Sequence, residues 1–154
     1  MKIVVIGDTH DNLANVTHVM GFAKKIKAGA IIHTGDWSSP KTVDAVLGYK
    51  IKLYAVSGNA DIDPYFNSHL DSFLEFRLDG KNIAVVHKLS DMYSQKYNNW
   101  DIIFTGHYHS QSLSSFSKNG NLYRSVRPGS LENEIMFAIY DTKTDKVEFI
   151  NLGK

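Results

Sequence analysis

The sequence contains no cysteine among its 154 residues. This absence excludes disulfide bonds, thiolate zinc sites and a cysteine nucleophile. Any metal ion that binds to the chain must therefore be held by nitrogen and oxygen ligands.

Long apolar runs and an excess of one charge are also missing. No stretch approaches the roughly 20 apolar residues that span a bilayer, and the opening run MKIVVIGDTH is too short for the apolar part of a signal peptide and its cleavage site. The 17 basic and 16 acidic residues nearly balance, so a nucleic-acid partner is not indicated. We expect a cytoplasmic protein with no membrane partner and one domain over residues 1–154, because this length suits a single core.

The first part of the sequence alternates between two kinds of pattern. The runs KIVVIG, AIIHTGD and IKLYAVSGNAD are typical of strands that are buried on both faces. Apolar residues recur at helical spacing over 11–29, where Asp11 or Asn12 can cap the start, and Ser39 and Gly48 bracket a second short helix. This alternation predicts right-handed crossovers and a parallel sheet.

The second part of the sequence indicates more antiparallel pairing. FLEFRL alternates between apolar and polar residues, the Asp-Gly pair at 79–80 is typical of a hairpin turn, and NIAVVH follows as a buried strand. A polar stretch over 88–100 predicts a short helix, and SLSSFS, NLYRSV, IMFAIYD and KVEFIN predict further strands. We therefore expect an α/β fold with one parallel-rich sheet and a second, more antiparallel one.

Polar side chains follow or end five of the predicted strands. Because ligands bind beyond the carboxyl ends of parallel strands, these side chains are expected to converge. They are Asp8, His10, Asp36, Asn59, His87, His107 and His109. A glycine, which allows a sharp turn and a close approach, stands directly before four of them.

The set contains two carboxylates, one amide and four imidazoles. Taken alone, Asp8 and Asp36 could be helix caps, Asn59 a turn former and His87 a buried hydrogen-bonded imidazole. Taken together, seven donors suit two metal ions that share one bridging carboxylate. Mixed nitrogen and oxygen donors favour manganese, iron, zinc, cobalt or nickel over an all-oxygen calcium site.

The donors lie in five short segments of the chain. These are DTH at 8–10, GD at 35–36, GNAD at 58–61, VVH at 85–87 and GHYH at 106–109. In this order they resemble the five motifs of the calcineurin-like metallophosphoesterases. The chain length and the PGS segment at 128–130 are similar to the small single-domain phosphodiesterase branch of that superfamily. The resemblance implies a sandwich of two mixed β-sheets flanked by helices, in agreement with the predicted α/β class.

The resemblance also implies a role for each donor. Three residues would hold the first metal ion: Asp8, His10 and His109. Three others would hold the second: Asn59, His87 and His107. Asp36 would bridge the two divalent ions, of which manganese is the expected one, and Asn59 would also touch the substrate. The implied activity is that of a phosphodiesterase or phosphatase that attacks the phosphorus of a small phosphoester with a bridging hydroxide.

Three positions depart from the pattern of the family. Ala60 replaces a histidine that is proposed to protonate the leaving group, and Asp11 or Asp61 are candidates to substitute for it. Lys88 replaces a glycine and could reach a substrate phosphate or point to solvent. Arg127 replaces an asparagine and offers a planar fork that suits phosphate.

The remaining histidines are expected to have structural or solvent roles. His33 is predicted to be a hydrogen-bonded core histidine, whereas His18 and His69 are expected at the surface. A different function for the same fold is a protein-binding scaffold with little or no catalysis, as in the retromer scaffold subunit. Loss of the histidine at Ala60 favours this alternative slightly, and the complete donor set argues against it. A homo-oligomer is compatible with the sequence.

Overall fold

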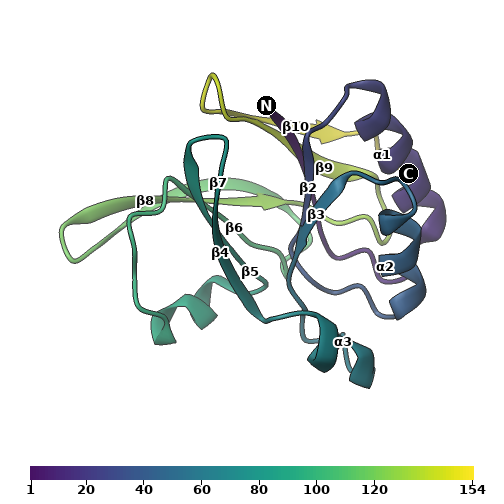
Figure 1. Cartoon of the computed structure of the whole chain (residues 1–154), viewed down its shortest axis with the longest axis horizontal. Coiled ribbons are helices and arrows are strands. Elements are labelled where there is room, and N and C mark those ends of the chain that lie inside the picture. Colours follow the sequence, from purple (N-terminus) through teal and green to yellow (C-terminus); the bar gives the residue numbers. More distant parts are fainter.

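Ten strands form two five-stranded sheets that pack face to face in the computed structural model, which describes all 154 residues (Figure 1). The first sheet has the order β10–β9–β1–β2–β3, with β1 (Lys2–Ile6), β2 (Ala30–His33), β3 (Lys52–Ala55), β9 (Met136–Asp141) and β10 (Lys146–Asn151). The second has the order β4–β5–β6–β8–β7, with β4 (Phe73–Leu78), β5 (Lys81–Val86), β6 (Ile102–Phe104), β7 (Gln111–Lys118) and β8 (Asn121–Pro128).

Both sheets are mixed, as the predicted fold class requires. In the first sheet β1, β2 and β3 are parallel, and β9 and β10 add antiparallel pairs. In the second sheet β5, β6 and β8 are parallel, and β4 and β7 add antiparallel pairs. The expectation of a more antiparallel second sheet is therefore wrong. Its hairpins could be predicted from the sequence. The parallel β6–β8 pairing could not, because β7 lies between these two strands in the chain and no local sequence pattern encodes the pairing.

Two helices cover the outer face of the first sheet (Figure 1). Helix α1 (Leu13–Lys25) begins after Asn12, whose side chain accepts a hydrogen bond from the backbone N–H of Asn15 at 3.1 Å. Helix α2 (Pro40–Leu47) begins after Ser39 as predicted. The Ser39 hydroxyl does not cap the helix, however, because it donates to Asp11 Oδ1 at 2.6 Å.

A third helix, α3 (Pro64–His69), was not predicted. Its start carries ordinary signals, since Asp63 accepts from the backbone N–H of Tyr65 and Pro64 occupies the first turn. The helix predicted within 88–100 is a short 3₁₀ helix, η1 (Leu89–Ser94). None of these helices combines the length and the apolar character needed to cross a bilayer.

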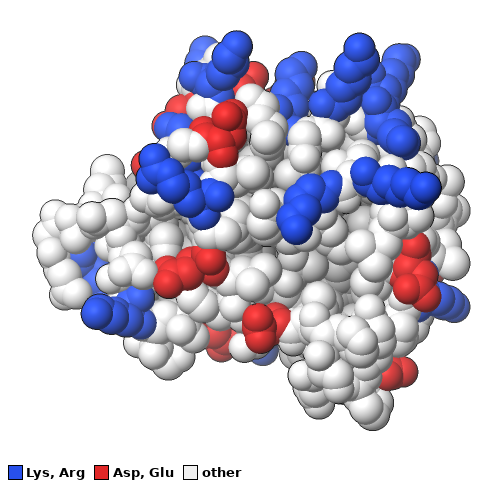
Figure 2. All heavy atoms as spheres, in the orientation of Figure 1, with Lys and Arg blue, Asp and Glu red and all other residues white.

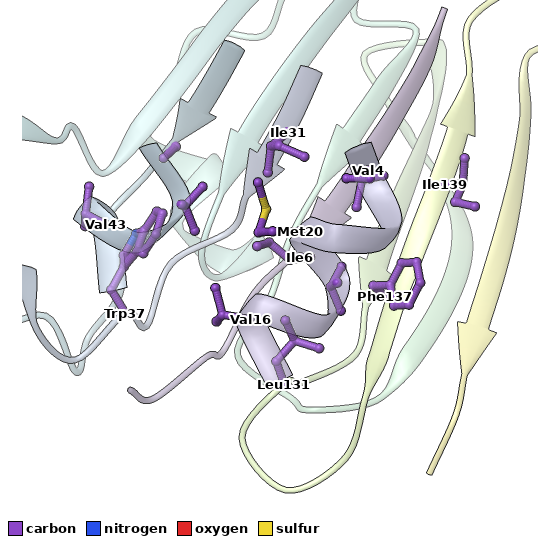
Figure 3. Close-up of a cluster of buried hydrophobic side chains, with 14 of the residues drawn as sticks. Val4, Ile6, Val16, Met20, Ile31, Trp37, Val43, Leu131, Phe137 and Ile139 are labelled. Carbon is purple, nitrogen blue, oxygen red and sulfur yellow. The ribbon is translucent and has the colours of Figure 1, made fainter. Parts of the chain in front are cut away.

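The alternation of side chains in β1 divides the core into layers. Val4 and Ile6 face the helices and pack in a cluster with Met20 of α1 (Figure 3). Ile3 and Val5 point the other way, into a cluster between the two sheets. Burial on both faces explains the continuous apolar run of this strand, and it fixes the end of the strand from which the polar donors project.

Positive charge gathers at one end of the molecule. Lys2, Lys52 and Lys146 begin strands β1, β3 and β10, and Figure 2 shows lysine and arginine side chains crowded along the edge above these strands. The polar donors follow the opposite, carboxyl ends of β1, β2 and β3. The cationic edge and the donors therefore occupy opposite ends of the first sheet.

Candidate metal centre

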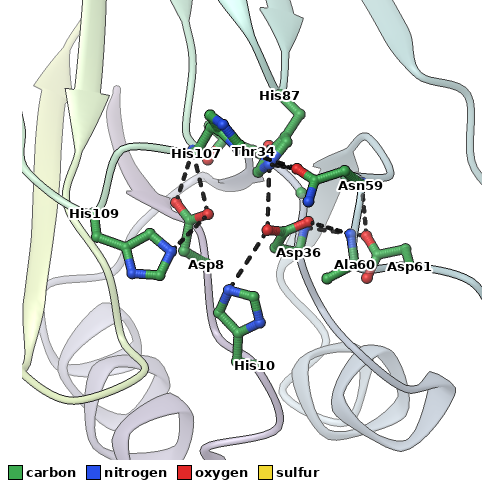
Figure 4. Close-up of polar contacts among 12 residues, drawn as sticks. Asp8, His10, Thr34, Asp36, Asn59, Ala60, Asp61, His87, His107 and His109 are labelled. Carbon is green, nitrogen blue, oxygen red and sulfur yellow. Dashed lines mark hydrogen bonds and ion pairs between the residues drawn. The ribbon is translucent and has the colours of Figure 1, made fainter.

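Loops that follow β1, β2, β3, β5 and β6 bring the seven predicted donors together (Figure 4). Six of them form two groups in which the potential ligand atoms all lie within 4.8 Å of one another. The groups are Asp8, His10 and His109, and Asp36, His87 and His107. This division is the one that the resemblance implied, with Asp36 assigned to both ions.

Asp36 lies at the junction of the two groups. Its Oδ2 is 3.5 Å from His10 Nε2 and 3.3 Å from His87 Nε2, so it faces one imidazole of each group. Its other oxygen accepts a hydrogen bond from the backbone N–H of Ala60 at 2.9 Å. The side chain is 4% exposed, and its position between the two groups would let one carboxylate contact both.

The amide of Asn59 completes the second group. Its Oδ1 is 3.0 Å from both His87 Nε2 and His107 Nδ1. In the first group, His109 Nε2 approaches Asp8 Oδ1 to 3.5 Å. Asp8 also accepts from the backbone N–H of His107, at 3.2 Å and 3.1 Å for its two oxygens, which ties the two groups together.

The orientation of the imidazoles fits a bound cation. His87 Nδ1 is 2.8 Å from the carbonyl oxygen of Thr34 and must carry the proton there, so a neutral ring turns only a lone pair toward Asp36. His10 Nε2 is buried and makes no hydrogen bond. Lone pairs that face carboxylate oxygens repel each other unless a proton or a cation lies between them. The donor set and its geometry therefore suit divalent metal ions.

The backbone at the strand ends is strained in a way that aims these side chains. Five of the seven donors have a positive φ, which is uncommon outside glycine. They are Asp8 (47°), His10 (41°), Asp36 (61°), His107 (78°) and His109 (53°). Such conformations cost about 1–3 kcal/mol each and cluster at functional sites.

Two glycines are required by the crowding of the loops. Gly35 has a φ of 101°, and a Cβ there would lie 2.8 Å from His87 Nδ1 and 2.9 Å from the backbone nitrogen of Gly58. A Cβ on Gly58 would collide with Asp36 Oδ1. The glycines before Asp36 and Asn59 therefore let the loops after β2 and β3 touch.

The electrostatic environment differs between the two carboxylates. Burial raises the pKa of Asp8 to about 6, against the opposing charges of His87 and His109. Burial also acts to raise the pKa of Asp36, but the positive charge that His87 carries when protonated and the hydrogen bond from the Ala60 N–H outweigh it, so the net shift of this pKa is downward. The charge of Asp36 also raises the pKa of Asp8, and bound cations would relieve this repulsion.

Several supporting residues had not been found in the sequence. Glu132 Oε2 is 3.4 Å from His109 Nδ1, on the side of the ring away from Asp8. Ser38 Oγ is 3.2 Å from His10 Nδ1, and the Ser130 hydroxyl donates to the Asp8 carbonyl at 2.9 Å. Only Ser130, within the PGS segment, carried a sequence signal. Glu132 could have been found only by knowing that its segment returns to β1.

The two carboxylates considered as substitute acids are occupied by donors. Asp61 accepts hydrogen bonds from four backbone N–H groups, at distances between 2.7 Å and 3.0 Å. Burial raises the pKa of Asp61, and these hydrogen bonds oppose that shift. Asp11 Oδ1 accepts from the hydroxyls of Ser39 and Thr42. Asp61 therefore orients the loop around Asp36, and Asp11 anchors the start of α2.

Lys88 and Arg127 lie near the donors, and their contact with substrate stays a prediction. The pKa of His107 is lowered mainly by burial and to a smaller extent by the positive charges of neighbours, including Lys88. Lys88 is therefore close enough to the centre to act on it electrostatically. Arg127 donates from Nε to the Ser110 carbonyl and from Nη2 to the Ser110 hydroxyl, both at 3.0 Å. Its guanidinium carbon lies 5.1 Å from the ring centroid of Tyr108.

The prediction for His33 is confirmed. The residue is fully buried, its Nδ1 accepts from the backbone N–H of Gly35 at 3.1 Å, and its Nε2 is 3.2 Å from Thr9 Oγ1. Nε2 therefore carries the proton, and the ring links the loops after β1 and β2. His18 and His69 are exposed, as expected.

Comparison with known families gives one match over most of the chain. Residues 1–145 match the family model of the calcineurin-like phosphoesterase superfamily domain. No curated protein matches the chain in sequence.

Solved structures with a similar fold include enzymes and a sorting protein. An archaeal phosphodiesterase is 22% identical with a TM-score of 0.78, covering 99% of this chain and 100% of that one. The phosphoesterase Yfce from E. coli is 16% identical with a TM-score of 0.73, at 99% and 100% coverage. Vps29 from Entamoeba histolytica, complexed with zinc, is 18% identical with a TM-score of 0.68, at 98% and 99% coverage. At these identities the likeness shows the fold.

Proposed function

The chain belongs to the calcineurin-like phosphoesterase superfamily, and from this premise we propose that it is a metal-dependent phosphodiesterase acting on small phosphoesters. The observation that carries the proposal is the pair of donor groups joined by Asp36, in which the ligand atoms of each group lie within 4.8 Å of one another. The expected cofactor is two divalent ions, with manganese first among them.

Each donor has a defined task in this proposal. Asp8, His10 and His109 hold one ion, and His87, His107 and Asn59 hold the other. Two bound cations polarise the phosphoryl oxygens and lower the pKa of the attacking water. Asp36 keeps the two groups in register, because its Oδ2 faces His10 and His87 at 3.5 Å and 3.3 Å.

The phosphate of the substrate meets polar groups at the rim of the centre. The amide nitrogen of Asn59 is free to donate to a phosphoryl oxygen, since its Oδ1 faces His87 and His107. Lys88 adds a positive charge near His107. These contacts position the phosphorus and stabilise charge, which are the main requirements of phosphoryl transfer.

The leaving group receives no proton from the position that often supplies one in the superfamily. That position is Ala60, and Asp11 and Asp61 already accept hydrogen bonds from their own loops. The proposed enzyme therefore depends on substrates whose leaving oxygen is stable as an anion.

The alternative function is a protein-binding scaffold without turnover. Vps29 shares the fold, and the absence of a histidine at Ala60 is compatible with it. The strained backbone of five donors argues for catalysis, because strain of this kind is retained where geometry matters.

Hydrolysis of bis(4-nitrophenyl) phosphate after metal stripping and reconstitution tests the proposal. Wild type should be inactive after stripping and regain activity with one or more of manganese, nickel, cobalt, zinc and iron. Asp36→Asn should lower kcat at least 100-fold, because it removes the charge shared by both ions. Metal binding without turnover would favour the scaffold, and activity that survives both treatments would refute the mechanism.

A further inference from the structure

Two cavities on the outer face of the second sheet adjoin each other and begin beside the metal centre. The first, of about 80 Å³, is lined by Thr105, Gly106 and Tyr108, which flank His107, together with Ser112 and Arg127. The second, of about 310 Å³, is lined by Tyr93, Tyr97, Phe116 and Lys118. Both cavities include Leu89, Ser114 and Ser125 in their walls. We call this continuous depression the serine–tyrosine groove.

Hydroxyl groups dominate the end of the groove that lies nearest the metal centre. Thr105 and Ser125 are only 4% and 6% exposed and line the first cavity. The hydroxyls of Ser112 and Ser114 lie 3.3 Å apart on the neighbouring strand. The only fully buried polar side-chain atom without a hydrogen-bond partner is His10 Nε2, so these hydroxyls carry no penalty for an unmet hydrogen bond, and in the cavity wall they can donate to or accept from a polar ligand.

Aromatic rings and one cation form the far end of the groove. Tyr93 is 70% exposed, and Lys118 Nζ lies 5.7 Å from its ring centroid and 4.7 Å from that of Tyr97. Phe116 stacks on Tyr123 at 5.6 Å, which fixes the wall behind them. Tyr97 is half-buried against Tyr123, whereas the exposed ring of Tyr93 beside a lysine suits a flat aromatic ligand.

The length of the groove follows from the register of β7 and β8. Ser112 pairs with Arg127 at the near end, and Phe116 pairs with Tyr123 four residues along. At about 3.4 Å per residue this separation is about 14 Å. A sugar and one base fit in this span, whereas a nucleic-acid strand would continue beyond it.

We propose that the serine–tyrosine groove binds a nucleoside as the substituent of a phosphodiester substrate. The sugar meets the hydroxyls of Thr105, Ser112 and Ser125, and the base stacks on Tyr93 beside Tyr97. This inference rests on the proposed phosphodiesterase function and names the class of substrate for the same centre. The groove recognises a single nucleoside, in keeping with the absence of an excess of positive charge in the chain.

Two esters with the same leaving group test the proposal. Thymidine 5′-(4-nitrophenyl phosphate) and methyl 4-nitrophenyl phosphate both release nitrophenolate, so they differ only in the group that would occupy the groove. Stacking of one base predicts a KM at least about fivefold lower for the thymidine ester. The double variant Tyr93→Ala, Tyr97→Ala should erase this difference and leave the methyl ester unchanged. Leu122→Ala, on the same hairpin but outside both cavities, is the control and should retain it.

A binding experiment separates failure of the groove from failure of the catalytic proposal. Thymidine 5′-monophosphate should shift the backbone amide resonances of Tyr93, Tyr97 and Ser125, and inorganic phosphate should not. Hydrolysis of both esters with equal KM, or shifts confined to the metal centre, would overturn the groove. No hydrolysis of either ester with any metal ion, together with shifts at the tyrosines, would refute the phosphodiesterase and support the groove as a nucleoside site.

Discussion

Replacement of Asp61 by alanine should destabilise the fold strongly, because this one carboxylate accepts four backbone hydrogen bonds. Asp61 Oδ1 accepts from the backbone N–H groups of Trp37 and Ser38 at 2.7 Å and 2.8 Å. Its Oδ2 accepts from those of Asp36 and Gly58 at 3.0 Å and 2.7 Å. At about 1 kcal/mol for each net hydrogen bond, the four contribute about 4 kcal/mol. Removing the charge also removes its desolvation cost, so we expect Asp61→Ala to lower the free energy of unfolding by about 3 kcal/mol.

Urea denaturation of the metal-free chain at pH 8 measures this loss without a contribution from bound ions. Asp61→Asn retains one acceptor oxygen, and we expect about half the loss because two of the four N–H groups would face an amide NH₂. Asp63→Ala is the matched control, since Asp63 is exposed and accepts only from the backbone N–H of Tyr65. Its loss should be about 1 kcal/mol. A change below 1 kcal/mol for Asp61→Ala would refute the reasoning.

Three further predictions concern the metal centre, the leaving group and pH. Glu132→Gln should weaken metal binding about 10- to 100-fold, because Glu132 orients His109; calorimetric titration measures the change, and unaltered affinity would contradict it. Because Ala60 cannot donate a proton, bis(4-nitrophenyl) phosphate should be cleaved much faster than a matched dialkyl ester, and equal rates would count against this. Burial raises the pKa of Asp145, but hydrogen bonds from Tyr140, Arg124 and Lys81 make the net shift downward. The carboxylate therefore stabilises the fold above the unfolded pKa of about 4 and loses this effect in acid. Asp145→Asn should lower stability less at pH 3 than at pH 7 in paired urea titrations, and a constant difference would be the contrary result.

The parts of the fold that were predictable from sequence are those with local causes. β1 and β2 are buried on both faces, and their sequences are continuous apolar runs. Asn12 and Ser39, which directly precede α1 and α2, are residue types that favour helix starts. The convergence of polar residues at the strand ends was predictable because parallel strands share an edge. The structure brings those residues together, and their roles as ligands stay predictions.

Features that depend on contacts distant in sequence were not predictable. Glu132 contacts His109 because β9 pairs with β1 and brings the segment before it to the same end of the sheet. The parallel pairing of β6 with β8 determines the strand order of the second sheet. The serine–tyrosine groove likewise needs η1 and the β7–β8 hairpin to lie side by side. Helix α3 was not predicted for a different reason. Asp63 and Pro64 are local signals of a helix start, but the helix is too short to show a helical spacing of apolar residues.

Counting the ions bound by the chain tests the central claim most directly. Metal-free protein titrated with Mn²⁺ should bind two ions for each chain, and electron paramagnetic resonance should show them magnetically coupled through a shared ligand. Asp36→Asn should abolish the coupling. A stoichiometry of one or none, or a coupled pair that persists without the Asp36 carboxylate, would contradict the account.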